Sequence, residues 1–160
     1  MRPPLNSPLE HGLRVLVLLT EAYPERLDIN HLVLLDHGVL HTAELGGPPS
    51  IHPSHALHAG ELGVRRVSVE EGLQVMMRAG LVTMRASSTG IRFEAGDEAH
   101  SFVSALGSSY IVELRDRTRW VVEQLLALSE EDIRQQMSAL LGSRPGDGSD
   151  QERGTDPWNG

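Results

Sequence analysis

The chain has 160 residues, a formal net charge of −8, 39% apolar and 4% aromatic residues, and no cysteine. This length favours one main domain, and its core must be built from aliphatic side chains. The lack of cysteine excludes disulfides and thiolate metal sites and is typical of a reducing compartment. No apolar run is long enough to span a membrane, and the first residues lack the apolar core of a signal peptide. These features predict a cytoplasmic protein.

The first predicted element is an apolar helix. Ser7 and Glu10 have the spacing of a capping box, and Pro24 ends the helix, which is predicted over about residues 9–23. Apolar residues cover nearly its whole circumference, so we expect this helix to be central and buried. Arg14 interrupts the apolar surface and therefore needs a carboxylate partner.

A second helix and a long connection follow. Asp28 is placed to cap a helix over about residues 29–41, whose apolar side chains recur at helical spacing. Residues 46–60 are rich in proline and glycine, which precludes regular structure, and they form a longer connection than is usual. Loops of this length are often functional or disordered. This one occupies the place where we expect a first short strand or an embellishment of the fold.

A third helix comes next. Ser68 and Glu71 form a second capping-box pattern, so the helix is predicted to begin after Ser68 and to end at Gly80. Its outer face is predicted to carry four polar residues: Glu70, Glu71, Gln74 and Arg78.

Two short strands are predicted after this helix. Apolar and polar residues alternate over residues 82–86 and again over 91–94, on either side of a turn at residues 87–90. The alternation places Arg85 and Arg92 together on the solvent face of the hairpin.

The rest of the chain is predicted to be helical up to its tail. A short helix is expected over residues 97–106, and a long one from Ser108 or Ser109 to about Leu128. The long helix has an apolar stripe with heptad spacing, which suits packing against another helix. Ser129 is placed to cap a last helix.

This order of elements predicts a mainly α, α+β fold: a winged helix-turn-helix core with a β-hairpin wing and appended C-terminal helices. We expect a winged-helix domain over residues 1–107 and a helical extension over residues 108–141. Residues 142–160 consist mostly of glycine, proline and charged residues, which predicts a disordered tail.

Winged-helix domains often bind DNA, but the charge of this chain argues against that function. The outer face of the third helix carries carboxylates, which a phosphate backbone repels. Five arginines could still form a basic patch over the helix start and the wing: Arg65, Arg66, Arg78, Arg85 and Arg92. Alternatively they are solvated or pair with nearby glutamates (Glu61, Glu70, Glu71 and Glu94), or they bind an acidic protein partner.

The chain has eight histidines, which raises the question of a metal site. The stretch "HPSHALH" supplies His52, His55 and His58, and "HGVLH" places His37 and His41 on one helical face. Three histidines and a water can hold zinc, but neither stretch has the carboxylate base of a hydrolytic site. Hydrogen bonding is therefore the favoured role of the histidines. No nucleotide-binding or nucleophile motif is present, so we expect a protein without catalytic residues or a cofactor.

Several stretches resemble the middle component, type 2, of bacterial ABC-three component systems. They lie between Asn6 and Leu128 and read "NSPLEHGLRVLVLLTEAYP", "LDHGVLHTAELGGPPSIHP", "GELGVRR", "GLQVMMRAGLV" and "ELRDRTRWV". Such systems include Lamassu-like anti-phage defence operons. The resemblance implies a winged-helix subunit that joins an ABC ATPase of the structural-maintenance-of-chromosomes (SMC) type to an effector.

The resemblance also implies a distinctive surface made of the long loop and a "GVRR" turn. Its interface or loop-shaping residues would be Gly46, Gly47, Pro48, His52, Pro53, Gly60, Glu61, Arg65 and Arg66. The sequence thus predicts an adaptor that docks through the heptad face of the long helix and through the arginines of the loop and wing. Trp120 is either a core residue or an anchor for the partner.

Two alternatives stay open at this point. The chain could be a homodimeric winged-helix transcription regulator, in which the long helix pairs with its copy and the wings bind DNA. It could also be a metal-dependent enzyme that uses His52, His55 and His58. The first alternative predicts salt-sensitive binding to duplex DNA, and the second predicts stoichiometric zinc.

Overall fold

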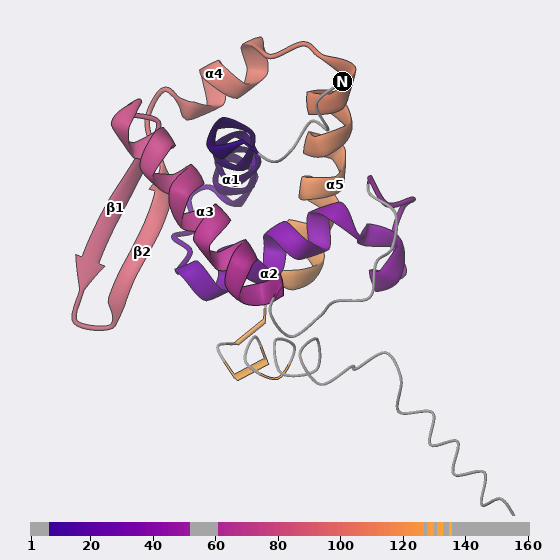
Figure 1. The fold of residues 1–160 in the computed structure, drawn as a ribbon, viewed down its shortest axis with the longest axis horizontal. Coiled ribbons are helices and arrows are strands. Elements are labelled where there is room, and N and C mark those ends of the chain that lie inside the picture. The colour runs from indigo at the N-terminus through magenta and orange to yellow at the C-terminus, as the bar shows by residue number, and fades with distance from the viewer. Residues whose placement is uncertain (1–6, 52–60, 127, 130, 133–134, 136–160) are drawn as a thin grey trace, which may run out of the picture.

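The computed structural model describes residues 7–51, 61–126, 128, 129, 131, 132 and 135. These ranges contain helices and one β-hairpin (Figure 1). The elements in chain order are α1 (Pro8–Ala22), α2 (Ile29–Leu40), the 3-10 helix η1 (Thr42–Leu45), α3 (Glu61–Arg78), β1 (Val82–Ser87), β2 (Gly90–Ala95), α4 (Ala99–Ala105) and α5 (Ser109–Leu125).

Helix α1 lies at the centre of the fold, as its composition predicts. Its start is a complete capping box, in which the Glu10 N–H donates to Ser7 Oγ and the Ser7 N–H donates to Glu10 Oε2. Residues 15–19 are fully buried, because α1 packs against α2, α3, α4, α5 and β2. Figure 1 shows α1 end-on, surrounded by the other helices.

Helices α1 and α3 approach each other closely at two glycines. A Cβ atom added at Gly72 would lie 2.7 Å from the Gly12 nitrogen, so no larger residue fits there without moving the backbone. This contact packs α3 directly against the central helix α1. It therefore helps to orient α3, whose C-terminal end precedes the hairpin.

The layout is winged-helix-like, as predicted. Strands β1 and β2 pair antiparallel, and Arg85 lies directly opposite Arg92. Leu27, in the connection before α2, pairs with Phe93 of β2 through two backbone hydrogen bonds of 2.8 and 2.9 Å. In place of a third strand beside β2, the hairpin therefore has one paired residue, Leu27, from the connection between α1 and α2. Residues 46–51, where the sequence suggested a first strand, do not pair with the hairpin.

The predicted start of α3 is wrong. The helix begins at Glu61, so Ser68 and Glu71 lie inside it, and the "GVRR" segment is helical rather than a turn. Local spacing suggested a cap at Ser68, but contacts from Arg65 to α2 stabilise the earlier turns. Tertiary interactions therefore override the capping signal here.

Helix α5 packs inside the molecule. The helix packs against α1 and α2, and most of its predicted apolar stripe is buried: Ile111, Leu114, Thr118 and Val121, joined by Val122. The last two residues of the stripe, Leu125 and Leu128, are only partly buried. The predicted packing on another helix is confirmed. The predicted docking of a partner on this stripe is wrong, because the chain's own helices cover it. α5 thus shares one core with α1 and α2, and the domain division at residue 107 stays a prediction.

Little of the chain after α5 is described. The Asp132 N–H donates to Ser129 Oγ, and the Ser129 N–H donates to Asp132 Oδ2, both at 3.1 Å. Ser129 is therefore a cap, as predicted. Most of the predicted last helix and the whole 142–160 tail lie outside the described residues.

Candidate protein interface

A buried carboxylate joins the first three helices. Asp36 of α2 accepts from Arg14 Nε at 2.9 Å and Arg14 Nη2 at 3.2 Å, and from Arg65 Nη1 of α3 at 2.8 Å. Burial raises the pKa of Asp36, but the two guanidiniums outweigh this effect and lower the pKa to about 2. Asp36 is thus the predicted carboxylate partner of Arg14.

The Asp36 cluster changes the interpretation of Arg65. The sequence suggested that Arg65 contacts a partner protein, yet its side chain is largely buried and bonded to Asp36. A carboxylate substituted at Arg65 would face Asp36 inside the protein and destabilise the fold. Arg65 therefore positions the first turns of α3, and charge reversal there cannot test binding alone.

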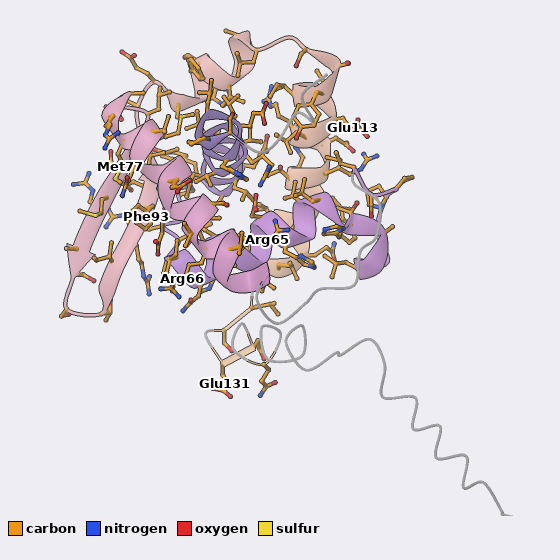
Figure 2. All side chains as sticks on the ribbon, in the orientation of Figure 1. Arg65, Arg66, Met77, Phe93, Glu113 and Glu131 are labelled. Carbon is orange, nitrogen blue, oxygen red and sulfur yellow. The ribbon has the colours of Figure 1, made fainter. Side chains whose placement is uncertain are left out.

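The first turns of α3 extend beyond the packed core. Val64 and Val67 are 68% and 52% exposed, whereas Val69 and Leu73 are buried. Arg66 is exposed and contacts Glu70 at 3.4 Å and Asn30 of α2 at 3.3 Å. Figure 2 shows Arg65 and Arg66 at the end of α3 that overlies α2. This end of α3 therefore presents an apolar pair flanked by a cation.

The solvent face of the wing holds a second cluster. Glu94 of β2 accepts from Arg85 Nε at 2.7 Å and from Arg26 Nε at 3.0 Å. Hydrogen bonds from Arg85 and then Arg26 lower the pKa of Glu94. Pairing of the arginines with nearby glutamates was one of the alternatives that the sequence left open, and for Arg85 the partner is Glu94. Arg26 connects the wing to the segment before α2 through the same carboxylate. Both arginines therefore already share a carboxylate of the protein itself.

A pocket of about 160 Å³ lies at the root of the wing. Its walls come from the connection before α2, from α2, from β2 and from the residues after α5: Glu25, Arg26, Leu27, Asp28, His31, Arg92, Leu126 and Leu128. Asp28 accepts from the backbone and the ring of His31 at 2.9 and 2.8 Å, which caps α2 as predicted. Arg92 is half-buried here rather than extended into solvent.

The other face of the wing is apolar, and its outer half is exposed. Val82, Phe93 and Ala95 are buried at the base of the hairpin, while Met84 and Ile91 are 51% and 52% exposed towards its tip. We use the name α3–wing surface for four exposed apolar residues of these two elements: Val64 and Val67 of α3, and Met84 and Ile91 of the wing. Arg78 is exposed at the C-terminal end of α3 and has no ion pair among the described residues.

The start of the long loop is fixed to α5. Arg117 Nε donates to the Pro49 carbonyl at 2.8 Å, and Thr42 Oγ1 donates to the Pro48 carbonyl at 2.8 Å. Gly46 has a φ of 78°, a backbone conformation that favours glycine. Residues 46–51 therefore form an ordered platform on α5.

Trp120 is part of this platform. A Cβ atom added at Gly47 would lie 2.5 Å from Trp120 Cη2, so the indole ring packs directly on the glycine. The structure thus brings together Gly46, Gly47, Pro48 and Trp120, which the sequence assigned to an interface. His52, Pro53 and Gly60 lie outside the described residues, as does the side chain of Glu61.

The described residues contain no group of three or more potential metal ligands. The candidates His52, His55 and His58 lie outside those residues, so the metal hypothesis for them stays untested. No described helix is both long enough and apolar enough to span a membrane.

Sequence reasoning missed the residues that organise these clusters. The sequence could have identified Asp36 as the partner of Arg14, because Asp36 is the only acidic residue within α2. Val64 and Val67 were hidden because the capping pattern at Ser68 placed them outside the helix. Glu94 accepts hydrogen bonds from two arginines, and one of them, Arg26, is distant in sequence. No local sequence signal predicts the contact between Arg26 and Glu94.

One comparison with known proteins gives a match. The family model described as ABC-three component system Middle Component 2 matches residues 4–144. No curated protein and no solved structure matches the chain.

Proposed function

The chain belongs to the Middle Component 2 family of ABC-three component systems, and we propose that it is their non-catalytic adaptor. In this proposal it joins an SMC-type ABC ATPase to an effector protein in a cytoplasmic anti-phage defence complex. The family belongs to a system of several components, which supports a role in which the chain contacts other components.

The α3–wing surface is the observation that carries this proposal. In DNA-binding winged helices this region contacts phosphates, which requires free cations. Here Arg85 is bonded to Glu94 and Arg66 contacts Glu70, while Val64, Val67, Met84 and Ile91 are exposed. Exposed apolar residues, in a region whose arginines Arg66 and Arg85 are paired with glutamates, suit a protein partner better than a nucleic acid.

The homodimeric regulator has less support. That hypothesis requires a dimer formed through the apolar stripe of α5, but most of this stripe is buried within the chain. Binding of duplex DNA through Arg78 and the wing is kept as an outcome that the following experiment distinguishes.

The test is a pull-down of the tagged full chain from its native host, with nuclease present and at physiological salt. We expect a large ABC ATPase, identified by mass spectrometry, to be retained in stoichiometric amount. The double variant Val64→Glu/Val67→Glu should lose it, because two charges would enter the apolar contact.

Val112→Glu is the matched control, since Val112 is a comparably exposed valine on α5, 60% exposed. It should retain the ATPase. Loss of all partners on nuclease treatment would contradict the adaptor function. A complex that is unchanged in the Val64→Glu/Val67→Glu variant would contradict the assignment of the docking surface.

A further inference from the structure

Strand β1 has a free edge. It pairs with β2 over six residues, and within the described part of the chain no other strand lies beside it. Figure 1 shows β1 as the outermost strand of the hairpin. A free edge leaves a row of backbone donors and acceptors onto which another strand can add. Proline and bulges are common devices against such addition, and β1 contains neither.

Two contacts show which backbone groups of β1 point to this edge. The N–H and C=O of Phe93 bond to Leu27 on the far side of β2, so Phe93 exchanges no hydrogen bonds with Met84 opposite it. The Gly96 N–H donates to the Leu81 carbonyl at 2.8 Å, and bonded and non-bonded pairs alternate along an antiparallel ladder. Both contacts indicate that the even-numbered residues of β1 direct their N–H and C=O groups outwards. These residues are Val82, Met84 and Ala86.

The sequence of this edge is complementary to itself. If two copies of β1 run antiparallel about Met84, the two Met84 residues lie opposite each other and exchange hydrogen bonds. Val82 then lies opposite Ala86 of the second copy, so apolar residues meet on one face of the sheet. On the other face Thr83 lies opposite Arg85, so no like charges meet.

Other symmetric registers fit less well. An axis between two residues would place outward groups opposite groups that already bond to β2. An axis at Arg85 would place two arginines directly opposite each other, which is destabilising. An axis at Thr83 would place Ala86 opposite Gly80, which lies outside the strand. The register about Met84 is therefore the favoured one.

We propose that this edge joins two copies of the chain into a homodimer with a continuous four-stranded antiparallel sheet. Such a contact is isologous, because the same strand is used by both copies. The two Met84 side chains, each 51% exposed in the single chain, would pack beside each other. One pair of short strands buries less than the roughly 1,200–2,000 Å² of a stable interface, so we expect a reversible equilibrium between monomer and dimer.

This dimer is independent of the proposed adaptor function. It uses the edge of the wing, so the faces of both hairpins stay open to other proteins. It also leaves the apolar stripe of α5 inside each copy.

The test is sedimentation equilibrium of the purified full chain from micromolar to millimolar concentration, where we expect a reversible dimer. Ala86→Pro removes an outward N–H but no hydrogen bond to β2, and the residue before it is already extended, as proline favours. It should weaken dimerisation by about tenfold or more, because each copy loses a donor. Ala86→Ser is the matched control, since it keeps the N–H, and should dimerise like the wild type.

Amide hydrogen exchange of the wild type locates the contact even if Ala86→Pro does not fold. Raising the protein concentration should slow exchange at Met84 and Ala86, whereas Thr83 and Arg85, which bond to β2, should change much less. A chain that stays monomeric at millimolar concentration would overturn the proposal. A dimer in which exchange at Met84 and Ala86 is independent of concentration would overturn it too, as would full dimerisation of a folded Ala86→Pro variant.

Discussion

The molecule uses one arrangement twice, in two different surroundings. Asp36 and Glu94 are each held by two arginines that come from separate elements. Asp36 lies among three helices at 1% exposure, whereas Glu94 lies on the solvent face of the wing at 16%. The same ion-pair chemistry therefore operates in a dry interior and next to water.

This difference separates structural arginines from functional ones. Inside the protein, a charge left without its partner is costly, so the Asp36 cluster must stay intact. On the surface, water can replace a lost partner at little cost, so the Glu94 cluster can rearrange when another molecule binds. Residue type alone does not distinguish Arg65 from Arg85, because only burial assigns them to different roles.

The largest expected effect is that of Asp36→Asn. It leaves the buried guanidinium of Arg14 and the largely buried one of Arg65 without a carboxylate. We expect the free energy of unfolding to fall by about 3–5 kcal/mol, as for other broken buried pairs. Urea denaturation followed by circular dichroism measures this. A loss below about 1 kcal/mol would show that the Asp36 cluster does not differ from a surface pair.

Acid should weaken the Asp36 cluster in a defined pH range. The pKa of Asp36 falls from 3.8 to about 2 on folding, so its stabilising contribution is complete above pH 3.8. That contribution is lost as the pH falls from 3.8 towards 2 and the carboxylate becomes protonated. The stability difference between wild type and Asp36→Asn should therefore narrow over this range. A difference that does not depend on pH would contradict the ion-pair explanation.

A smaller effect is expected for Gly47→Ala. The added Cβ would lie 2.5 Å from the Trp120 ring, so the indole must move off the loop. We expect a loss of about 1–3 kcal/mol, typical of overpacking. The emission of Trp120 should also change, because the surroundings of its indole ring change. This is measured in a Trp158→Phe background, in which Trp120 is the only tryptophan.

Gly63→Ala is the matched control for this substitution. A Cβ atom there has no neighbour within 4 Å and lies in α3, so it should instead stabilise the fold by about 0.5–1 kcal/mol. Equal effects of both substitutions would contradict the packing of Trp120 on Gly47.

The sequence predicts the elements better than the clusters. Capping boxes, apolar periodicity and alternation locate α1, α2, the hairpin and α5, because those signals are local. The start of α3 is missed because Arg65 and Asp36 are far apart in the chain, and their contact determines it. The same limit applies to the interface, where the sequence gives the residues but not their partners. The alternation correctly places Arg85 and Arg92 on one face of the hairpin, yet the pairing of Glu94 with Arg85 and Arg26 follows only from the fold.

The smallest effect on stability, and the sharpest on function, is expected for Glu94→Gln. Exposed ion pairs contribute little to stability, so the variant should fold normally. It removes the carboxylate shared by Arg85 and Arg26, however, and so leaves one cation on the wing and one in the segment before α2 without that partner. If only these ion pairs keep the wing from phosphates, duplex DNA should then bind about tenfold more tightly at low salt, with a steeper salt dependence.

Fluorescence anisotropy with a labelled duplex at several salt concentrations measures this gain. Glu113→Gln is the control, because it removes a carboxylate next to Arg117 on α5, away from the wing (Figure 2). If the wild type already binds DNA as tightly as the Glu94→Gln variant, Glu94 does not prevent the wing arginines from contacting phosphates. The wing would then bind DNA as in a transcription regulator. If only Glu94→Gln gains binding, one carboxylate distinguishes a protein-binding wing from a DNA-binding one, and the surface cluster acts as a barrier to nucleic acid.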